Sequence, residues 1–249
     1  GSLTLNDLLI DDTGQSARAK FERAQDKWGG AFSGTLNKQT LDRIFLTAPV
    51  QLGLLQGDFA VNVFSKPPYR LSARGTLAGK DIVSPLKGED AVIEQFVVQG
   101  DPAGLNIRSA DLRWRRSHLA VSGKLAAAQD ALQVDMDVGA DRVVWEEFSA
   151  IAGTAAGQKE QGNGQFTVPA VKGVIRLNAE RLDVGTLSWT PLQIAARLTA
   201  NGVDGEIENG VVCGIRTAGR FAVQKNDQIE LDLRLAVKDR DLDSTSRCL

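Results

Sequence analysis

The side chains that most often perform catalysis are sparse in this chain and do not form a catalytic pattern. The single histidine, His118, has no suitably placed nucleophile beside it. Ser117 and Ser122 belong to a strand-like segment that lacks the G-x-S-x-G turn by which a serine nucleophile is exposed. We therefore interpret His118 as an ordinary exposed strand residue, and the sequence predicts neither a catalytic residue nor an enzyme.

Two pairs of carboxylates, Asp135 with Asp137 and Glu146 with Glu147, raise the possibility of acid–base catalysis or cation binding. A glycosidase needs two carboxylates that face each other across a cleft. Asp135 and Asp137 instead alternate with apolar residues, which predicts that both point to solvent from one face of a strand. Trp114, between two arginines, could stack a sugar or a base, although a lone aromatic residue on a strand is more often a packing residue.

The two cysteines, Cys213 and Cys248, permit one disulfide bond. Such a bond would suit an oxidising compartment such as the periplasm, and the alternative is a pair of inert thiols. We expect no metal site, because two thiols and one distant histidine do not complete a tetrahedral set of zinc ligands. The sequence predicts no cofactor.

The dominant pattern is the alternation of apolar and polar side chains, clearest where Ile229, Leu231, Leu233 and Leu235 alternate with charged residues. A period of two predicts a β-strand with one apolar and one polar face. The segments are joined by short connections rich in glycine, aspartate and serine, which favour antiparallel neighbours. We therefore expect a mainly β fold, in which a curved antiparallel meander forms a groove or an open barrel-like trough with two or three short helices.

The pattern divides into two parts that share a weak internal resemblance. We expect a first β unit over residues 1–152, with short helices near 40–46 and 145–152, a flexible loop over 153–164, and a second β unit over 165–249. Thr40 is the expected N-cap of the first helix, with Asp42 in its first turn. Residues 17–28 fit a strand or a helix.

Charge and hydropathy argue against nucleic-acid binding and against a membrane-spanning helix within this sequence. The 29 lysines and arginines are interleaved with 31 aspartates and glutamates, which argues against nucleic-acid binding. No apolar run reaches the roughly 18 to 20 residues that span a bilayer, and no signal peptide is evident. Gly1 and Ser2 resemble residues left by protease cleavage, so a targeting segment or an anchor could precede this sequence.

A family resemblance rests on loose motifs that cover about half of the chain. They are the step Arg181, Leu182, Asp183; the pair Pro191, Leu192; Cys213, Gly214 and Ile215 before Gly219; the closing Cys248 and Leu249; and the segment 140–151. Residues 173–223 resemble the C-terminal region of the AsmA-like bacterial envelope proteins, which are related to the TamB group. The resemblance implies a periplasmic, inner-membrane-anchored protein of repeated β units with an apolar groove, which moves phospholipid or supports outer-membrane assembly. This chain lacks the family's N-terminal membrane helix.

These observations support a leading hypothesis and an alternative. The leading one is a non-enzymatic periplasmic lipid-handling module that holds the acyl chains of a phospholipid or another lipid. The alternative is a scaffolding β repeat whose edge strands bind a partner protein, such as an adjacent repeat or another envelope protein. A third hypothesis is a sugar-active enzyme or a carbohydrate-binding protein, which would need facing carboxylates or an aromatic platform. The residues expected to line the groove are Leu192, Ile194, Leu198, Ile229, Leu231, Leu233 and Leu235.

Overall fold

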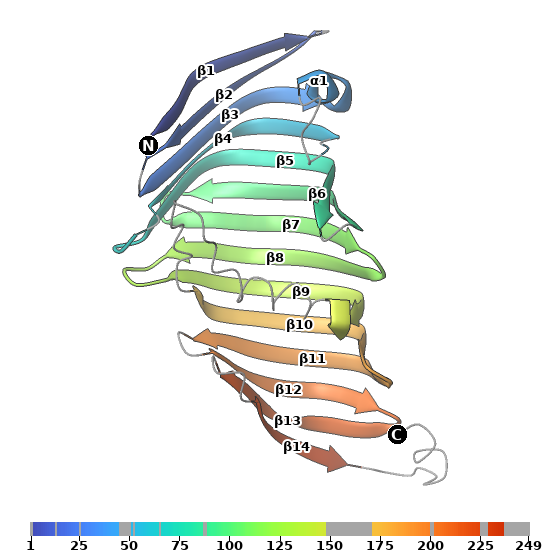
Figure 1. Cartoon of the computed structure of the whole chain (residues 1–249). Helices are drawn as coiled ribbons and strands as arrows, with labels where there is room; N and C mark the ends of the chain where they lie inside the picture. Colours follow the sequence, from blue (N-terminus) through green and yellow to red (C-terminus); the bar gives the residue numbers. More distant parts are fainter. Residues whose placement is uncertain are drawn as a thin grey trace. The chain divides into compact units, whose positions relative to one another are not determined.

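The computed structural model describes residues 2–12, 14–24, 26–44, 51, 53–64, 66–86, 89–147, 171–199, 202–224 and 229–236. Of residues 84–86, 89–90, 223–224, 229–231 and 233–236 it describes the backbone alone. These parts of the chain form fourteen strands, which are hydrogen-bonded in chain order in one largely antiparallel sheet (Figure 1). The exception is β9 with β10, which run in the same direction, as the cross-strand contacts of Asp137 with Arg176 and of Arg142 with Asp183 indicate. The strands are β1 (Leu3–Asp12), β2 (Gln15–Arg23), β3 (Lys27–Asn37), β4 (Leu54–Phe64), β5 (Arg70–Leu86), β6 (Glu89–Asp101), β7 (Gly104–Trp114), β8 (Ser117–Ala127), β9 (Leu132–Val144), β10 (Val171–Val184), β11 (Leu187–Thr199), β12 (Gly202–Val212), β13 (Ile215–Gln224) and β14 (Ile229–Ala236).

The predicted fold class is confirmed, because the protein is mainly β and its sheet is an open meander. Within the ambiguous segment 17–28, residues 17–23 belong to β2 and residues 27–28 to β3, and the two strands pair with each other over seven successive residues from Ala17 to Arg23. Tertiary pairing decides this segment, since its apolar spacing fits both periods.

The helix α1 (Lys38–Ile44) begins two residues before the predicted start. Its N-cap is Asn37, whose side-chain oxygen accepts a hydrogen bond of 2.9 Å from the backbone N–H of Thr40. The prediction of Thr40 as the cap is therefore wrong, and Asp42 lies beyond the first turn, where it pairs with Lys38 at 3.1 Å. A second helical stretch covers residues 145–147, and the rest of the predicted helix lies outside the described residues.

The chain divides into two compact units. Unit 1 comprises Gly1–Arg115, Ala120–Met136 and Thr167–Val171, and unit 2 comprises Arg116–Leu119, Asp137–Phe166 and Lys172–Leu249. The division passes through β8 and β9. The predicted loop over 153–164 lies outside the described residues.

Among the residues that the structure describes, each unit has one small cluster of buried apolar side chains. In unit 2, Ala140, Val143, Ala179 and Leu192 are buried together. In unit 1, Ala17, Leu36 and Leu41 are buried where α1 meets the sheet. Most other apolar strand residues that the structure describes are half-buried. The sheet therefore leaves much of its apolar surface partly accessible.

Candidate functional site

The strand register of unit 2 collects apolar residues on one side of the sheet. Ile194 of β11 lies opposite Leu177 of β10 and Ile207 of β12, and Leu198 lies opposite Val203. Directly opposed residues project to the same face, so alternation within each strand becomes a continuous surface across strands. We call this surface the unit 2 apolar face, and its half-buried members are Ile175, Leu177, Ile194, Ala196, Leu198, Val203, Ile207 and Phe221.

The opposite side of the same strands is polar. Arg197 lies opposite Asp204, and Arg220 lies opposite both Glu206 and Asp232. All five of these side chains are exposed. Opposite charges that face each other across strands stabilise a sheet modestly. This side is therefore suited to water, whereas the unit 2 apolar face is not.

The predicted groove residues of β11 occupy different environments. Leu192 is only 1% exposed and belongs to the buried cluster of unit 2. Ala179 lies opposite it on β10, and Gly210 lies opposite it on β12. Ile194 contacts the margin of that cluster and is half-buried, as is Leu198. Ile194 and Leu198 are thus partly accessible to solvent, whereas Leu192 lies in the core.

The other predicted groove residues lie on β14, and of these four residues only the backbone is described. Leu231 is opposite Phe221, and Leu233 is opposite Gly219, which in turn is opposite Ile207. Ile229 and Leu235 lie at equivalent positions of the same ladder, opposite Val223 and Thr217. Register therefore assigns these positions to the side of the unit 2 apolar face. Their role in binding stays a prediction.

Phe221 lies across a glycine on this face. A Cβ atom added to Gly205, directly opposite on β12, would overlap with the Phe221 ring. The same relationship occurs in unit 1, where a Cβ at Gly79 of β5 would overlap with the ring of Phe96, its partner on β6. In each case the absence of a side chain lets an aromatic ring lie over the neighbouring strand, which widens and smooths the apolar surface.

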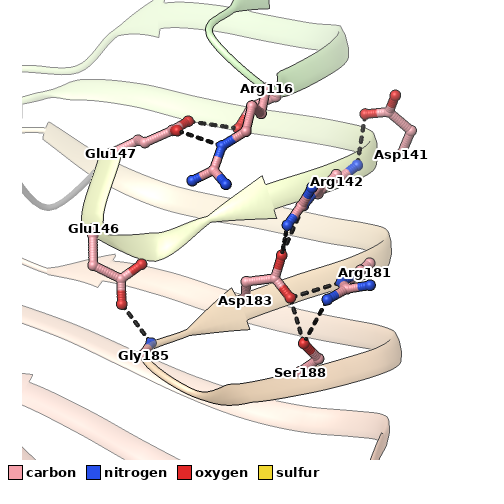
Figure 2. A network of polar contacts seen from close by, with 10 residues as sticks. Arg116, Asp141, Arg142, Glu146, Glu147, Arg181, Asp183, Gly185 and Ser188 are labelled. Carbon is pink, nitrogen blue, oxygen red and sulfur yellow. Dashed lines mark hydrogen bonds and ion pairs between the residues drawn. The ribbon is translucent and has the colours of Figure 1, made fainter.

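A network of charged groups lies at one end of the strands of unit 2 (Figure 2). Its centre is the buried carboxylate of Asp183, which accepts hydrogen bonds of 2.7 Å from Arg142 and of 2.7 Å from Arg181. The hydroxyl of Ser188 donates a third. Burial alone would raise the pKa of Asp183, but the hydrogen bonds from Ser188, Arg181 and Arg142 outweigh it and lower the pKa to about 2.

The neighbouring glutamates point to separate partners (Figure 2). Glu147, whose side chain is 7% exposed, accepts hydrogen bonds from Arg116 at 3.2 Å and Ser117 at 3.3 Å. Glu146 is exposed and accepts a hydrogen bond from the backbone N–H of Gly185, which lowers the pKa of its carboxyl group. The two carboxylates do not face each other, so they do not form the acid–base pair that their adjacency raised as a possibility. These contacts link the segment that follows β9 to the turn between β7 and β8 and to the turn between β10 and β11.

The other residues that the sequence analysis considered for chemistry also form contacts within the fold. The backbone N–H of His118 donates to Asp141 at 3.2 Å, and Asp137 pairs with Arg176 at 3.1 Å. Trp114 is buried, and the Arg115 guanidinium lies 5.1 Å from the centre of its ring. That ring is therefore not an open stacking platform. In the described part of the chain, no group of three or more His, Cys, Asp or Glu side chains is placed to hold a metal ion.

A hollow of about 840 Å³ lies on the polar side of unit 1, over β3, β4 and β5. Its floor contains Gly34, Gly57 and Gly75, which adopt φ angles of 119°, 146° and 83°. A Cβ at any of these glycines would overlap with a backbone oxygen of the adjacent strand. Asp58 and Arg74 on its walls are exposed. The rest of its lining is glycine, threonine, glutamine and alanine.

Cys213 lies in the two-residue turn between β12 and β13, with φ of 51°, and Gly214 follows with φ of 76°. Its predicted partner, Cys248, lies outside the described residues, so the disulfide stays a prediction.

Two further findings bear on function. Among the described residues, no helix has the length and hydropathy needed to cross a membrane. No family model, curated protein or solved structure matches this chain.

Proposed function

We propose that this chain is a non-enzymatic lipid-handling module whose unit 2 apolar face holds the acyl chains of a phospholipid or another lipid. The observation that carries the proposal is the partial exposure of that face: Ile194, Leu198 and Ile207 are neither sealed in a core nor fully in water. A contiguous apolar surface that solvent can reach is typical of a binding site.

The chemistry of the face suits an acyl chain better than a polar ligand. Its half-buried members are aliphatic except for Phe221, which extends over Gly205. Burying one methylene group contributes about 0.8 kcal/mol, so contact with several methylenes supplies useful affinity without a hydrogen bond. Because no polar group lies among these members, the face would distinguish lipids poorly by headgroup.

The polar side explains how such a surface remains in solution. Cross-strand charges such as Arg197 opposite Asp204 keep one side hydrated while the other contacts lipid. We further propose, from the sequence resemblance alone, that the chain belongs to the AsmA-like envelope proteins. Its setting would then be the periplasm, as part of an inner-membrane-anchored protein that serves phospholipid transport or outer-membrane assembly.

Photocrosslinking from adjacent residues of β11 tests the proposal. Benzoylphenylalanine at Leu198 samples the apolar side, and the same group at Arg197 samples the polar side of the same strand. After purification without detergent from cells, we expect a lipid adduct by mass spectrometry at position 198 and none at 197. Equal labelling at both positions, or no lipid adduct at 198, would contradict the proposal.

A further inference from the structure

The outer edge of β1 has no partner strand within the described part of the chain. β1 is first in the strand order and pairs only with β2. Half of the backbone N–H and C=O groups of such a strand point away from its neighbour, which makes an edge strand a template for a further strand. A sheet edge of this kind is the site at which extended peptides bind by strand addition.

Exposed apolar side chains are concentrated at this edge. Leu3 is 62% exposed and Leu9 is 61% exposed, and Leu5 and Leu8 also exceed one third. Phe21, the neighbour of Leu5 on β2, is 38% exposed. Elsewhere in the described chain only Trp145 and Val171 are large apolar residues of comparable exposure. The gathering of leucines on one strand indicates a surface that a partner covers.

The edge is also held in place by unit 1. Ile10 packs against the buried cluster of Ala17, Leu36 and Leu41. Asp12 accepts hydrogen bonds from Thr40 at 3.0 Å and from Arg43 at 2.9 Å, both on α1. A preformed edge avoids part of the ordering cost of association. β1 has no lysine or proline to discourage pairing, although its register shifts between Leu5 and Leu8.

The side chains of β1 define the chemistry of the partner. Register places Leu5, Leu8 and Ile10 on one side, opposite Phe21, Ala19 and Ala17, and it places Leu9 and Asp11 on the other side. β1 carries three aspartates and no basic residue. Asp7 and Asp12 pair with Arg18 and Arg43, whereas Asp11 is exposed and forms no ion pair with any described residue.

We propose that the outer edge of β1 binds an extended strand of a partner protein that carries apolar side chains on one face and lysine or arginine on the other. Basic residues would lie beside Asp11, and apolar residues beside Leu5 and Leu8. A second copy of β1 would bring acidic residues without compensating bases, which disfavours self-pairing. This docking site is separate from the unit 2 apolar face, so lipid binding and strand binding can fail independently.

The probe is a fluorescent ten-residue peptide of alternating lysine and leucine, measured against the whole chain. Two matched peptides serve as controls: one has glutamate at each lysine position, and the other has proline at alternate leucines to block backbone pairing. Binding is measured by anisotropy, and hydrogen exchange locates the protected amides. The protein variant is Asp11→Lys, and the control variant is Asp58→Lys, an exposed acid on the interior strand β4.

We expect the lysine–leucine peptide to slow exchange within residues 3–12 alone, with little binding of either control peptide. Asp11→Lys should weaken binding about tenfold by replacing an attraction with a repulsion, and Asp58→Lys should leave it unchanged. Protection away from β1, or equal binding of the glutamate peptide, would overturn the proposal. Concentration-dependent self-association through β1 without peptide would also overturn it and would identify a second copy as the occupant.

Discussion

Arg142 donates a hydrogen bond of 2.7 Å to the carboxylate of Asp183, although the two residues are 41 positions apart in sequence. The bond joins β9 to β10 at the end of unit 2 where the polar network lies (Figure 2). Because Asp183 is buried, its charge depends on these partners for compensation. This dependence makes the stability of unit 2 sensitive to acid.

We expect Asp183 to stabilise the folded protein above its unfolded pKa and to lose that contribution in acid. The folded pKa is lowered from 3.8 to about 2, so the contribution is complete above about pH 4 and disappears as the pH falls through 2. A shift of this size corresponds to about 2 kcal/mol of unfolding free energy. Urea unfolding of wild type and Asp183→Asn between pH 2 and 7 measures it.

Asp183→Asn should lower the unfolding free energy at pH 7 by at least about 2 kcal/mol. The difference in unfolding free energy from wild type should shrink in acid. Asp137→Asn is the control, because Asp137 forms an exposed ion pair with Arg176 and should cost less than about 1 kcal/mol. If both variants lose the same stability at every pH, the buried network is not the cause.

Leu192→Ala should destabilise the protein much more than Leu198→Ala. Leu192 fills the buried cluster with Ala179 and Val143, so its truncation leaves a cavity and should cost about 3 kcal/mol. Leu198 is half-buried, so its truncation should cost about 1 kcal/mol. Chemical unfolding of the two variants makes the comparison, and equal losses would place both residues in one environment.

Gly205→Ala should be destabilising because the added methyl group overlaps with the Phe221 ring. We expect a loss of about 1–3 kcal/mol, part of which Phe221→Leu should restore in the double variant. Gly30→Ala is the matched control on a strand, since its nearest neighbouring atom would be 3.9 Å away. An additive double-mutant cycle would show that the ring and the glycine are not coupled.

Replacing Ile194 and Leu198 by serine should reduce the lipid that copurifies with the protein. The two changes remove apolar contact from the unit 2 apolar face while leaving the buried Leu192 in place. Native mass spectrometry gives the lipid-bound fraction, and Arg197→Ser, on the polar side, serves as the control. Retention of lipid by the double variant at the level of the control would count against the face as the binding surface.

Cys213 and Cys248 should resist alkylation until a reductant is added, if the chain matures in an oxidising compartment. Reduction should then lower the melting temperature, because the bond would close a loop of 36 residues, counting both cysteines. Mass spectrometry after iodoacetamide treatment counts the modified thiols. Modification of both thiols without reductant would support the alternative of two free cysteines.

The sequence by itself determined the strands and their two faces. Alternation such as Leu192, Ile194, Leu198 against polar neighbours depends only on the extended backbone, in which successive side chains point to opposite sides. Short polar turns then made most neighbours antiparallel, so that part of the meander followed from local information. The pairing of β9 with β10, which residues 145–170 separate in the sequence, did not follow from any short turn. Local pattern does not decide the cap of α1, because Asn37 and Thr40 are both suitable cap residues. Asn37 takes that role, and the hydroxyl of Thr40 donates to Asp12 instead.

Only the tertiary structure decided which apolar residues are sealed and which charges meet. Leu192 and Leu198 share one face and one residue type, yet only Leu192 has Ala140, Val143 and Ala179 packed around it. Likewise, nothing local to Asp183 indicates that Arg142 lies against it. Exposure and charge pairing depend on what other strands bring alongside, and register, unlike alternation, is a property of pairs of strands.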